Sequence, residues 1–513
     1  MSQNFSENNK RIAKNTIALY FRTFITMIVG LYTSRIMLNA LGVDNYGIQN
    51  VVGSIVSMTS VITGAMSSAI SRFLTYGIGQ GDKKRLKTIF STSMNVQIIL
   101  SVIAVFVLEI VGVWFLNFQA NIPIDRMVAA NWVLQCSIIT TILTLVCSPF
   151  QATLIAHEHM TIYAYMSIVD VFLKLLVCYL IAIYEGDRLI LLSVLYVGVY
   201  LFLQVSYSWY CGKHFYEAHY NWRVLDKKLL KEMTSFSGWN LFGNTAWMLN
   251  TQGVNMLINV FFGVAFNAAR GIAVTVNAAI QSFITNFMVA FTPQITKNYA
   301  VGNFEYTYTL VNRGAKFSWL LMYMFIVPVV MEADMLLKLW LGNPPEYSAM
   351  FLRLAVFESL AVQSGSVLLQ LIQADGHIRR YSVEVSFFGF MVFPITWIAF
   401  LCGFPVWFPY LIFIIIYFNL NIIRFINLKR LMNFSVRRFL REALLPCILV
   451  SITAFILPLC VSLSMSPGLP RFIIVVFLSI LWTGLCAFFI GLTKNERMFF
   501  INRVKIVINK IKL

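Results

Sequence analysis

Charged side chains inside long apolar stretches are the residues of this sequence that can do chemistry where water is scarce. Lys174 lies near the middle of the apolar stretch 160–184, and Asp170 precedes it by four residues. A charge inside a membrane costs about 2.5–3.5 kcal/mol on insertion scales unless it faces a polar interior. The two side chains either neutralise each other as an i,i+4 pair or serve a transport path.

Seven other basic residues fall within apolar stretches. Arg22 lies well inside the first of them, 12–38, away from both headgroup layers. The other six lie near the ends of their stretches, where long side chains can also snorkel to the headgroups. They are Arg35, Arg72, Arg270, Lys338, Arg353 and Arg424. Because the planar fork of arginine can hold phosphate oxygens through two hydrogen bonds, these residues indicate an anionic ligand.

Carboxylates in the apolar stretches are candidates for carrying a coupling ion. They are Glu109, Asp170 and Glu358. A carboxylate held away from water can take up and release a proton near neutrality, and the membrane potential offers about 2.3 kcal/mol per charge per 100 mV as a driving force. Glu109 lies near the end of its stretch, where exposure to water is the alternative.

Amide and indole side chains are concentrated in two stretches, 234–262 and 265–291, and such groups suit the hydroxyls and ring faces of sugars. The alternative is interhelical hydrogen bonding between polar residues. The candidate sugar contacts are Asn240, Asn244, Trp247, Gln252, Asn277 and Gln281.

Membrane-spanning helices must position all of these residues. With 59% hydrophobic and 12% charged residues and a mean hydropathy of +0.76, the chain of 513 residues lacks the polar surface of a soluble protein. Stretches of about 20 apolar residues or more predict an all-α integral membrane protein with about fourteen transmembrane helices. They are 12–38, 46–76, 88–116, 127–154, 160–184, 189–210, 234–262, 265–291, 313–341, 348–373, 382–402, 406–428, 443–463 and 471–492.

Basic residues gather in alternate loops and in both tails. Most of the 39 Lys and Arg residues fall on one side of the predicted topology, in segments that include 77–87, 211–233 and 429–442. This positive-inside pattern predicts cytoplasmic N- and C-termini. Topology and anionic headgroups therefore account for the net charge of +18, and nucleic-acid binding is not needed to explain it.

A helix pair and its turn recur 221 positions apart. Gly42 in the turn LGVDNYGIQNVVGSI aligns with Gly263 in FFGVAFNAARGIAV. The turn Gly81–Asp82 aligns in the same way with Gly302–Asn303. Two copies of one unit indicate a chain that is built from two similar halves.

The proposed halves each contain six spans that start on the same side, so the repeat is parallel. The sequence thus predicts two parallel six-helix lobes plus two C-terminal helices. The expected boundaries are an N-lobe at 1–210, a cytoplasmic linker at 211–233, a C-lobe at 234–428, and the last two spans with a basic cytoplasmic tail at 429–513.

Three segments carry a resemblance to a known family. LGVDNYGIQNVVGSI (41–55), GIGQGDKKRLKTIFSTSM (77–94) and TPQITKNYAVGNFE (292–305), together with the fourteen-span plan, resemble Wzx-type polysaccharide repeat-unit flippases. These belong to the multidrug/oligosaccharidyl-lipid/polysaccharide exporter (MOP) superfamily. The resemblance covers nearly the whole chain, and it implies a MATE-like transporter fold of two six-helix lobes around a cavity.

The resemblance also implies a cargo, the polyprenyl-pyrophosphate-linked oligosaccharide units of O-antigen or capsule. Such proteins carry these lipids from the inner to the outer leaflet of the bacterial cytoplasmic membrane by alternating access. Moving an unshielded ion into hydrocarbon costs on the order of 20 kcal/mol, so the pyrophosphate needs a cationic cavity. Related lipid II flippases have cavity arginines in spans one, two and eight. We therefore expect the pyrophosphate to meet Arg22, Arg72, Arg270 and Lys174.

Other functions remain as alternatives at this point. A cation-coupled multidrug antiporter or a lipid II flippase of the same superfamily shares the plan, and a membrane glycan polymerase or ligase is a more distant one because the outer loops are short. The eight cysteines show no CxxC spacing and no P-loop is present. We expect a transporter that is not an enzyme, has no cofactor or metal, and has membrane lipids and a polysaccharide polymerase as partners.

Overall fold

The computed structural model is all-helical wherever it has regular elements. It describes the backbone of residues 2–80, 82–157, 159–300, 302–375, 378–432, 434–498 and 501. Side chains are described for these residues apart from a set within the helices. That set is 2–20, 60–62, 65, 68, 72, 76, 79–80, 160, 235–237, 239–244, 286, 289–294, 296–297, 300, 378–380 and 382.

The chain forms two compact units. Unit 1 comprises Met1–Ile272 and Phe393–Val406, and unit 2 comprises Ala273–Val392 and Trp407–Leu513. The predicted lobes, 1–210 and 234–428, have boundaries that differ from those of the two units. The division into lobes therefore stays a prediction.

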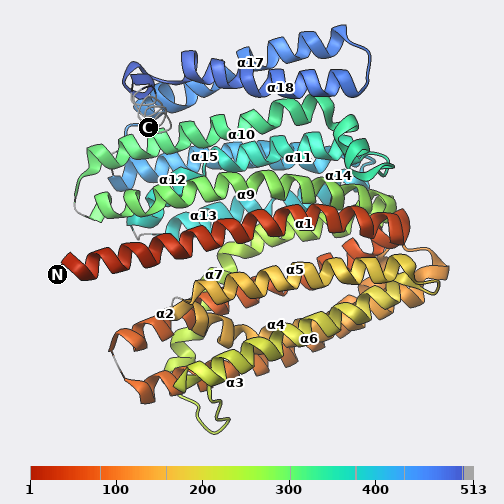
Figure 1. The fold of residues 1–513 in the computed structure, drawn as a ribbon, viewed down its shortest axis with the longest axis vertical. Helices are drawn as coiled ribbons and strands as arrows, with labels where there is room; N and C mark the ends of the chain where they lie inside the picture. The colour runs from red at the N-terminus through yellow and green to blue at the C-terminus, as the bar shows by residue number, and fades with distance from the viewer. Residues whose placement is uncertain are drawn as a thin grey trace, which may run out of the picture. The chain divides into compact units, whose positions relative to one another are not determined.

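Unit 1 contains the helices of the first half of the chain (Figure 1). Within it, α4 packs along α6, and α1 packs along α5. Its elements are α1 (Ser2–Ser57), α2 (Ser60–Gln80), α3 (Lys83–Val107), η1 (Leu108–Gly112), η2 (Phe115–Gln119), η3 (Ile124–Arg126), α4 (Met127–Ala156), α5 (Met160–Ile183), α6 (Arg188–His214), η4 (Tyr216–Ala218), α7 (Lys227–Met248), η5 (Leu249–Gly253), α8 (Val254–Phe262), the first residues of α9 (Val264–Ala300) and nearly all of α14 (Val392–Leu401).

Unit 2 contains the rest of α9 and the helices of the second half. The last two long helices, α17 and α18, lie side by side and pack on α10 (Figure 1). Its further elements are α10 (Phe304–Leu341), α11 (Ser348–Gln363), α12 (Ser366–Asp375), α13 (Ile378–Phe390), α15 (Phe408–Met432), α16 (Val436–Phe439), η6 (Leu440–Leu444), α17 (Leu445–Ser464), α18 (Leu469–Cys486) and η7 (Ala487–Gly491).

Eleven helical segments in the described part of the chain are long and apolar enough to cross a membrane. They coincide with eleven of the fourteen predicted spans. The three remaining predicted spans, 46–76, 234–262 and 265–291, are also largely helical, in α1 with α2, in α7 with α8, and in α9. Parts of these three lie among the residues without described side chains, so the number fourteen stays a prediction.

The repeat predicted around Gly42 and Gly263 is visible in the backbone. Gly42 interrupts α1 with φ 78° and ψ 172°, and Gly263 separates α8 from α9 with φ 90° and ψ 178°. Both values lie in the left-handed region, where glycine alone is unstrained. The two glycines therefore make equivalent corners between consecutive helices, as the 221-residue repeat requires.

A buried polar seam fixes the corner of Gly263 against α1. Asn255 Nδ2 donates to Ser54 Oγ at 2.6 Å, and Asn267 Nδ2 donates to Asn255 Oδ1 at 3.1 Å. Small residues allow this close approach, since a Cβ added at Gly47 would lie 2.2 Å from the carbonyl oxygen of Val264.

The expected linker, 211–233, is docked on unit 1 through side chains of α3. Asn95 Nδ2 donates to the carbonyl oxygen of Val224 at 3.1 Å, and its Oδ1 accepts from Tyr220 at 2.6 Å. Glu217, buried in η4, pairs with His157 at the end of α4. The segment predicted as a cytoplasmic linker is thus held by specific hydrogen bonds.

An ionic clamp connects the start of α4 with the turn between α5 and α6. Arg126 donates two hydrogen bonds to Asp187, at 2.9 and 3.1 Å, and Asp187 also caps α6 through the backbone N–H of Leu189. Burial alone raises the pKa of Asp187, but the hydrogen bonds from Arg126 and the α6 backbone outweigh it and lower the pKa below its usual range.

We expect this clamp to weaken in acid. Because the folded pKa of Asp187 is lowered, its contribution to stability is complete above the unfolded aspartate value of about 4 and is lost as the pH falls through the folded pKa. The thermal midpoint of Asp187→Asn should therefore lie below that of the wild type at pH 7, and the gap should close in acid. The exposed Asp125 provides the control variant Asp125→Asn, and an equal gap at every pH contradicts the prediction.

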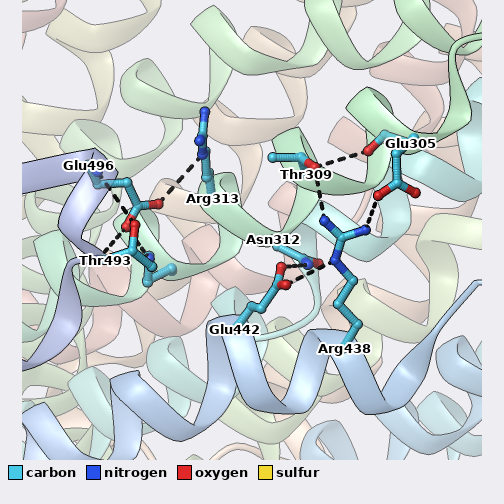
Figure 2. A network of polar contacts seen from close by, with 9 residues as sticks. Glu305, Thr309, Asn312, Arg313, Arg438, Glu442, Thr493 and Glu496 are labelled. Atoms are coloured by element: carbon cyan, nitrogen blue, oxygen red, sulfur yellow. Dashed lines mark hydrogen bonds and ion pairs between the residues drawn. The ribbon is translucent and has the colours of Figure 1, made fainter. Parts of the chain in front are cut away.

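A polar network ties the last helices of the chain to α10 (Figure 2). Arg438 in α16 contacts Glu305 in α10 and Glu442 in η6, the latter at 3.0 Å. Glu442 in turn accepts from Asn312 at 2.9 Å. These contacts lie near the start of α10, which begins at Phe304.

Glu496 forms the other half of this network. It accepts from Lys316 at 2.6 Å and from the backbone N–H of Thr493 at 2.9 Å, and it lies 3.5 Å from Arg313. The side chains of Lys316 and Glu496 are only 2% and 9% exposed. The residues around Glu496 are thus anchored to α10 by a buried ion pair.

Candidate functional site

A polar cavity of about 680 Å³ lies within unit 1. Its volume falls in the range of small-molecule sites, about 300–1,000 Å³. Helices α1, α2, α4, α5 and α6 form its wall together with the turn between α1 and α2. The polar part of the wall consists of Gln49, Ser57, Thr59, Thr63, Ser67, Ser137, Thr140, Thr141, Thr144, Ser148, Gln151, Lys174, Ser193, Tyr196 and Tyr200.

The hydroxyl groups of α4 reach the cavity because of their spacing. Ser137, Thr140, Thr144 and Ser148 recur every three or four residues and so share one face of the helix. Thr140 donates to the carbonyl of Ser137 at 2.9 Å, and Thr144 donates to that of Thr140 at 2.8 Å. Such bonds satisfy the hydroxyl proton inside an apolar span and leave the oxygen lone pairs directed outward.

Lys174 brings a positive charge to the cavity wall. Its Nζ donates to Asp170 Oδ2 at 2.9 Å and lies 3.5 Å from the Tyr200 hydroxyl and 4.8 Å from the Tyr200 ring centre. Both interpretations of the i,i+4 pair are thus compatible with the geometry, because the ammonium is paired and also faces the cavity.

The predicted arginines occupy different surroundings. The guanidinium carbon of Arg22, on α1, lies 5.4 Å from the Tyr163 ring centre on α5, a cation–π distance. Arg270, on α9, is 7% exposed and donates to the Thr251 carbonyl at 3.4 Å. The side chain of Arg72 lies outside the described residues, and its backbone is part of α2.

Two of the basic residues do not snorkel to headgroups, Arg270 and Arg424. Arg424 in α15 is 6% exposed, donates to the Tyr381 hydroxyl at 3.0 Å and to Asn421 at 2.7 Å. It fills the break between α11 and α12, where a Cβ added at Gly365 would lie 1.7 Å from its Nη1. Snorkelling is the wrong interpretation for Arg270 and Arg424, because neighbouring helices bury both side chains.

The candidate sugar contacts are only partly described. Asn277 and Gln281 share the Ser359 hydroxyl, at 2.9 and 2.5 Å, which is the interhelical alternative. Trp247 is 41% exposed, and Gln252 is half-buried in η5. The side chains of Asn240 and Asn244 lie outside the described residues.

The three candidate carboxylates are dispersed. Asp170 is paired with Lys174. Glu109, in the π-helical turn η1, accepts from Gln135 at 3.1 Å, and Glu358 is half-buried in α11 of unit 2. The structure brings one of the three, Asp170, next to the cavity, through its bond to Lys174.

An apolar groove of about 780 Å³ lies within unit 2, between α10 and α18. Its apolar wall is formed by Phe287, Leu310, Phe317, Leu320, Leu321, Met324, Gly484, Ala487, Phe488 and Leu492. Arg313 and Glu496 also line it, so polar groups stand beside an otherwise hydrophobic surface. A groove of this composition suits a hydrocarbon chain that ends in a polar head.

The sequence-based reasoning missed the hydroxyl-bearing wall and the network around Glu496. The repeated spacing of Ser137, Thr140, Thr144 and Ser148 within one apolar stretch was the available signal for the first. No comparable signal exists for the pairing of Lys316 with Glu496, which are 180 positions apart.

Comparison with solved structures defines the class of fold. The chain is similar to the lipid II flippase MurJ in its inward closed conformation, with a TM-score of 0.72 and 13% identity over 92% of this chain and 98% of that one. It is also similar to an inward-facing multidrug resistance transporter of the MATE family, with a TM-score of 0.60 and 12% identity over 81% of this chain and 99% of the other. The predicted all-helical, MATE-like membrane fold is thereby confirmed.

Two further proteins are similar to this chain. A MOP superfamily transporter from Pyrococcus furiosus has a TM-score of 0.61 and 14% identity over 80% of this chain and 94% of that one. The uncharacterized membrane protein EpsK of Bacillus subtilis (strain 168) is 18% identical over 333 residues, 63% of this chain. The match spans 64% of EpsK, less than two thirds of its length. No family model matches the chain.

Proposed function

We propose that this protein is a flippase that translocates polyprenyl-pyrophosphate-linked oligosaccharide repeat units across the bacterial cytoplasmic membrane by alternating access. The cargo combines a hydrocarbon chain, a diphosphate and a hydroxyl-rich head. A protein that moves it must offer each part a matching surface, because the head cannot cross hydrocarbon unshielded.

The observation that carries the proposal is the chemistry of the cavity in unit 1. Of the residues that the structure places on the wall, Lys174 alone carries a charge, and most of the other polar residues bear hydroxyls. An ammonium repels cationic drugs, and the neighbouring Asp170 is occupied by Lys174. The cavity therefore favours an anionic or neutral hydroxylated cargo over the cationic substrates of a multidrug antiporter.

The apolar groove in unit 2 supports the lipid-linked character of the cargo. It combines a hydrocarbon-like surface with Arg313, whose side chain is 43% exposed. Burying a polyprenyl chain there releases about 25 cal/mol per Å² of apolar surface removed from water. A small hydrophilic substrate would have no use for such a groove.

The proposed roles of the basic residues follow from this cargo. Arg22, Arg72 and Arg270 attract the pyrophosphate, Lys174 keeps cationic cargo out of the cavity, and Asp170, Glu358 or Glu109 exchanges the coupling ion. We expect Arg22→Ala to lower export at least tenfold, because a charge-assisted hydrogen bond contributes about 1.5–3 kcal/mol. Arg35→Ala, on the same helix, is the matched control.

The test is a gene deletion followed by complementation. Lipid-linked repeat units are extracted, their leaflet is assigned by accessibility to an external enzyme, and drug sensitivity and protein level are recorded alongside. Inner-leaflet accumulation that is reversed by the wild type and by Arg35→Ala, but not by Arg22→Ala, supports the proposal. Normal export by a stably inserted Arg22→Ala protein removes Arg22 from the pyrophosphate site.

The same experiment separates the alternatives. Accumulation of lipid II in place of repeat units identifies a lipid II flippase, the function of the MurJ structure that this fold resembles. Unchanged lipid intermediates with increased sensitivity to cationic drugs identify a multidrug antiporter. Outer-leaflet accumulation of single repeat units identifies a polymerase or ligase.

A further inference from the structure

We propose that the cavity in unit 1 seats a neutral pyranose ring of the cargo, so that it is a carbohydrate subsite and the pyrophosphate binds elsewhere. The proposal rests on the proposed function for the source of the sugar. Its evidence is separate, because it depends on which hydrogen-bonding groups of the cavity wall are still available to a ligand.

The wall presents acceptors more than donors. A hydroxyl has one proton and two lone pairs, and several wall hydroxyls give the proton to a carbonyl of their own helix. Thr140 and Thr144 do so on α4, and Ser193 donates to Leu189 at 2.9 Å on α6. Their remaining lone pairs accept hydrogen bonds from whatever occupies the cavity.

Two buried groups on the wall lack a protein partner within the described residues. Ser148 is 2% exposed and its Oγ makes no hydrogen bond there, and the buried Oε1 of Gln49 is likewise unpaired. Buried polar groups without a hydrogen-bond partner lower the stability of the protein by about 1–3 kcal/mol each. A ligand with several hydroxyl donors satisfies them.

The wall discriminates between kinds of ligand. A phosphate carries acceptors only, whereas several wall hydroxyls have given their proton to a backbone carbonyl and the one cationic donor, Lys174, already binds Asp170. A metal cation would accept the oxygens but is repelled by the same ammonium. A neutral polyol offers hydroxyl donors to the acceptors of the wall, and it carries no charge that Lys174 would repel.

The cavity also has the space and the apolar surface for a ring. Gly53 and Gly64 line it, and a Cβ built on either meets no atom within 4 Å. Val56 and Cys136 add apolar contact, against which the C–H face of a sugar can pack. The glycines also offer a direct test, because larger side chains at these positions enter empty space.

The first experiment measures binding directly. Full-length protein in lipid nanodiscs is mixed with glucose, galactose or N-acetylglucosamine, and saturation-transfer NMR detects the bound sugar, with inorganic pyrophosphate as competitor. We expect at least one sugar to bind, and Gly53→Leu to weaken it about tenfold or more. Gly30→Leu is the matched control, because Gly30 lies in α1 before the Gly42 corner, outside the cavity, and also faces open space. Thr140→Val with Thr144→Val should weaken binding about tenfold by removing two acceptors at constant shape.

The second experiment measures export by the same variants in the deletion strain. Gly53→Leu should reduce export at least tenfold at normal protein level, and Gly30→Leu should leave it unchanged. Export by Gly53→Leu at the wild-type rate overturns the proposal, as does displacement of the sugar by pyrophosphate, which makes the cavity an anion site. If no sugar binds and export is intact in every variant, the cavity holds only water. If sugars bind but no lipid-linked unit accumulates in the deletion strain, the subsite stands and the proposed function fails.

Discussion

Glu496→Ala is expected to lower the free energy of unfolding by about 3–5 kcal/mol, the usual cost of removing one partner of a buried ion pair. Glu496 neutralises Lys316, which is 2% exposed and has no solvent with which to replace the carboxylate. The same carboxylate receives the backbone N–H of Thr493 and faces Arg313 (Figure 2). Its loss leaves an uncompensated charge on Lys316 in α10.

The measurement is the thermal midpoint of the purified protein in detergent, followed by size-exclusion chromatography. We expect a fall of about 3–5 °C, because the unfolding entropy of a chain of 513 residues is about 1 kcal/mol/K. Asp334→Asn is the matched control, since Asp334 is 74% exposed in its pair with Arg353 and an exposed pair contributes only about 0–1 kcal/mol. Similar shifts in both variants would mean that burial does not set the strength of the Glu496 pair.

A double variant separates the charge from the packing. Lys316→Met combined with Glu496→Met removes both charges, and replacing a whole buried pair by apolar side chains is often neutral or stabilising. We expect it to recover most of the midpoint lost in Glu496→Ala. A double variant as unstable as the single one would assign the effect to lost packing around α10.

Gly47→Ala is expected to destabilise unit 1 by about 1–3 kcal/mol or more. The added Cβ would stand 2.2 Å from the carbonyl oxygen and 2.8 Å from the carbonyl carbon of Val264. Because these are backbone atoms, no rotamer change relieves the overlap, and the Gly263 corner must move away from α1.

Gly53→Ala on the same helix is the control for this prediction. Its Cβ meets nothing within 4 Å, and alanine is the better helix former by about 1 kcal/mol, so this variant should be as stable as the wild type or more so. The comparison uses thermal midpoints and the yield of monodisperse protein. Equal stability of the two variants would contradict the prediction, because it would mean that the backbone around Gly263 shifts away from α1 without a cost in free energy.

The separation of chemistries between the two units gives the proposed function its physical basis. Hydroxyls and one ammonium line the cavity in unit 1, and hydrocarbon side chains line the groove in unit 2. An amphipathic lipid needs both surfaces, whereas a small drug needs one. The Gly53→Leu and Arg22→Ala variants test the two polar parts of that cargo independently.

The sequence by itself determined the class and the helical content of this protein. Apolar stretches of spanning length predict helices because an unpaired backbone cannot cross a membrane, and eleven of them are found as such in the described part of the chain. The repeat was also readable, because Gly42 and Gly263 mark corners that need positive φ. These signals are local, and each depends on a few neighbouring residues.

Only the tertiary structure decided which polar residues meet. The sequence placed Lys174 in a span, but the convergence of five helices made it part of a hydroxyl-lined cavity. It suggested that Arg424 snorkels, yet Tyr381 and Asn421 bury that side chain. The physical reason is that a spanning helix is stable in lipid when it is apolar on every side, so its sequence does not show which face a neighbouring helix covers. Partners that are far apart in the chain, such as Lys316 and Glu496, are therefore determined by the packing of the helices.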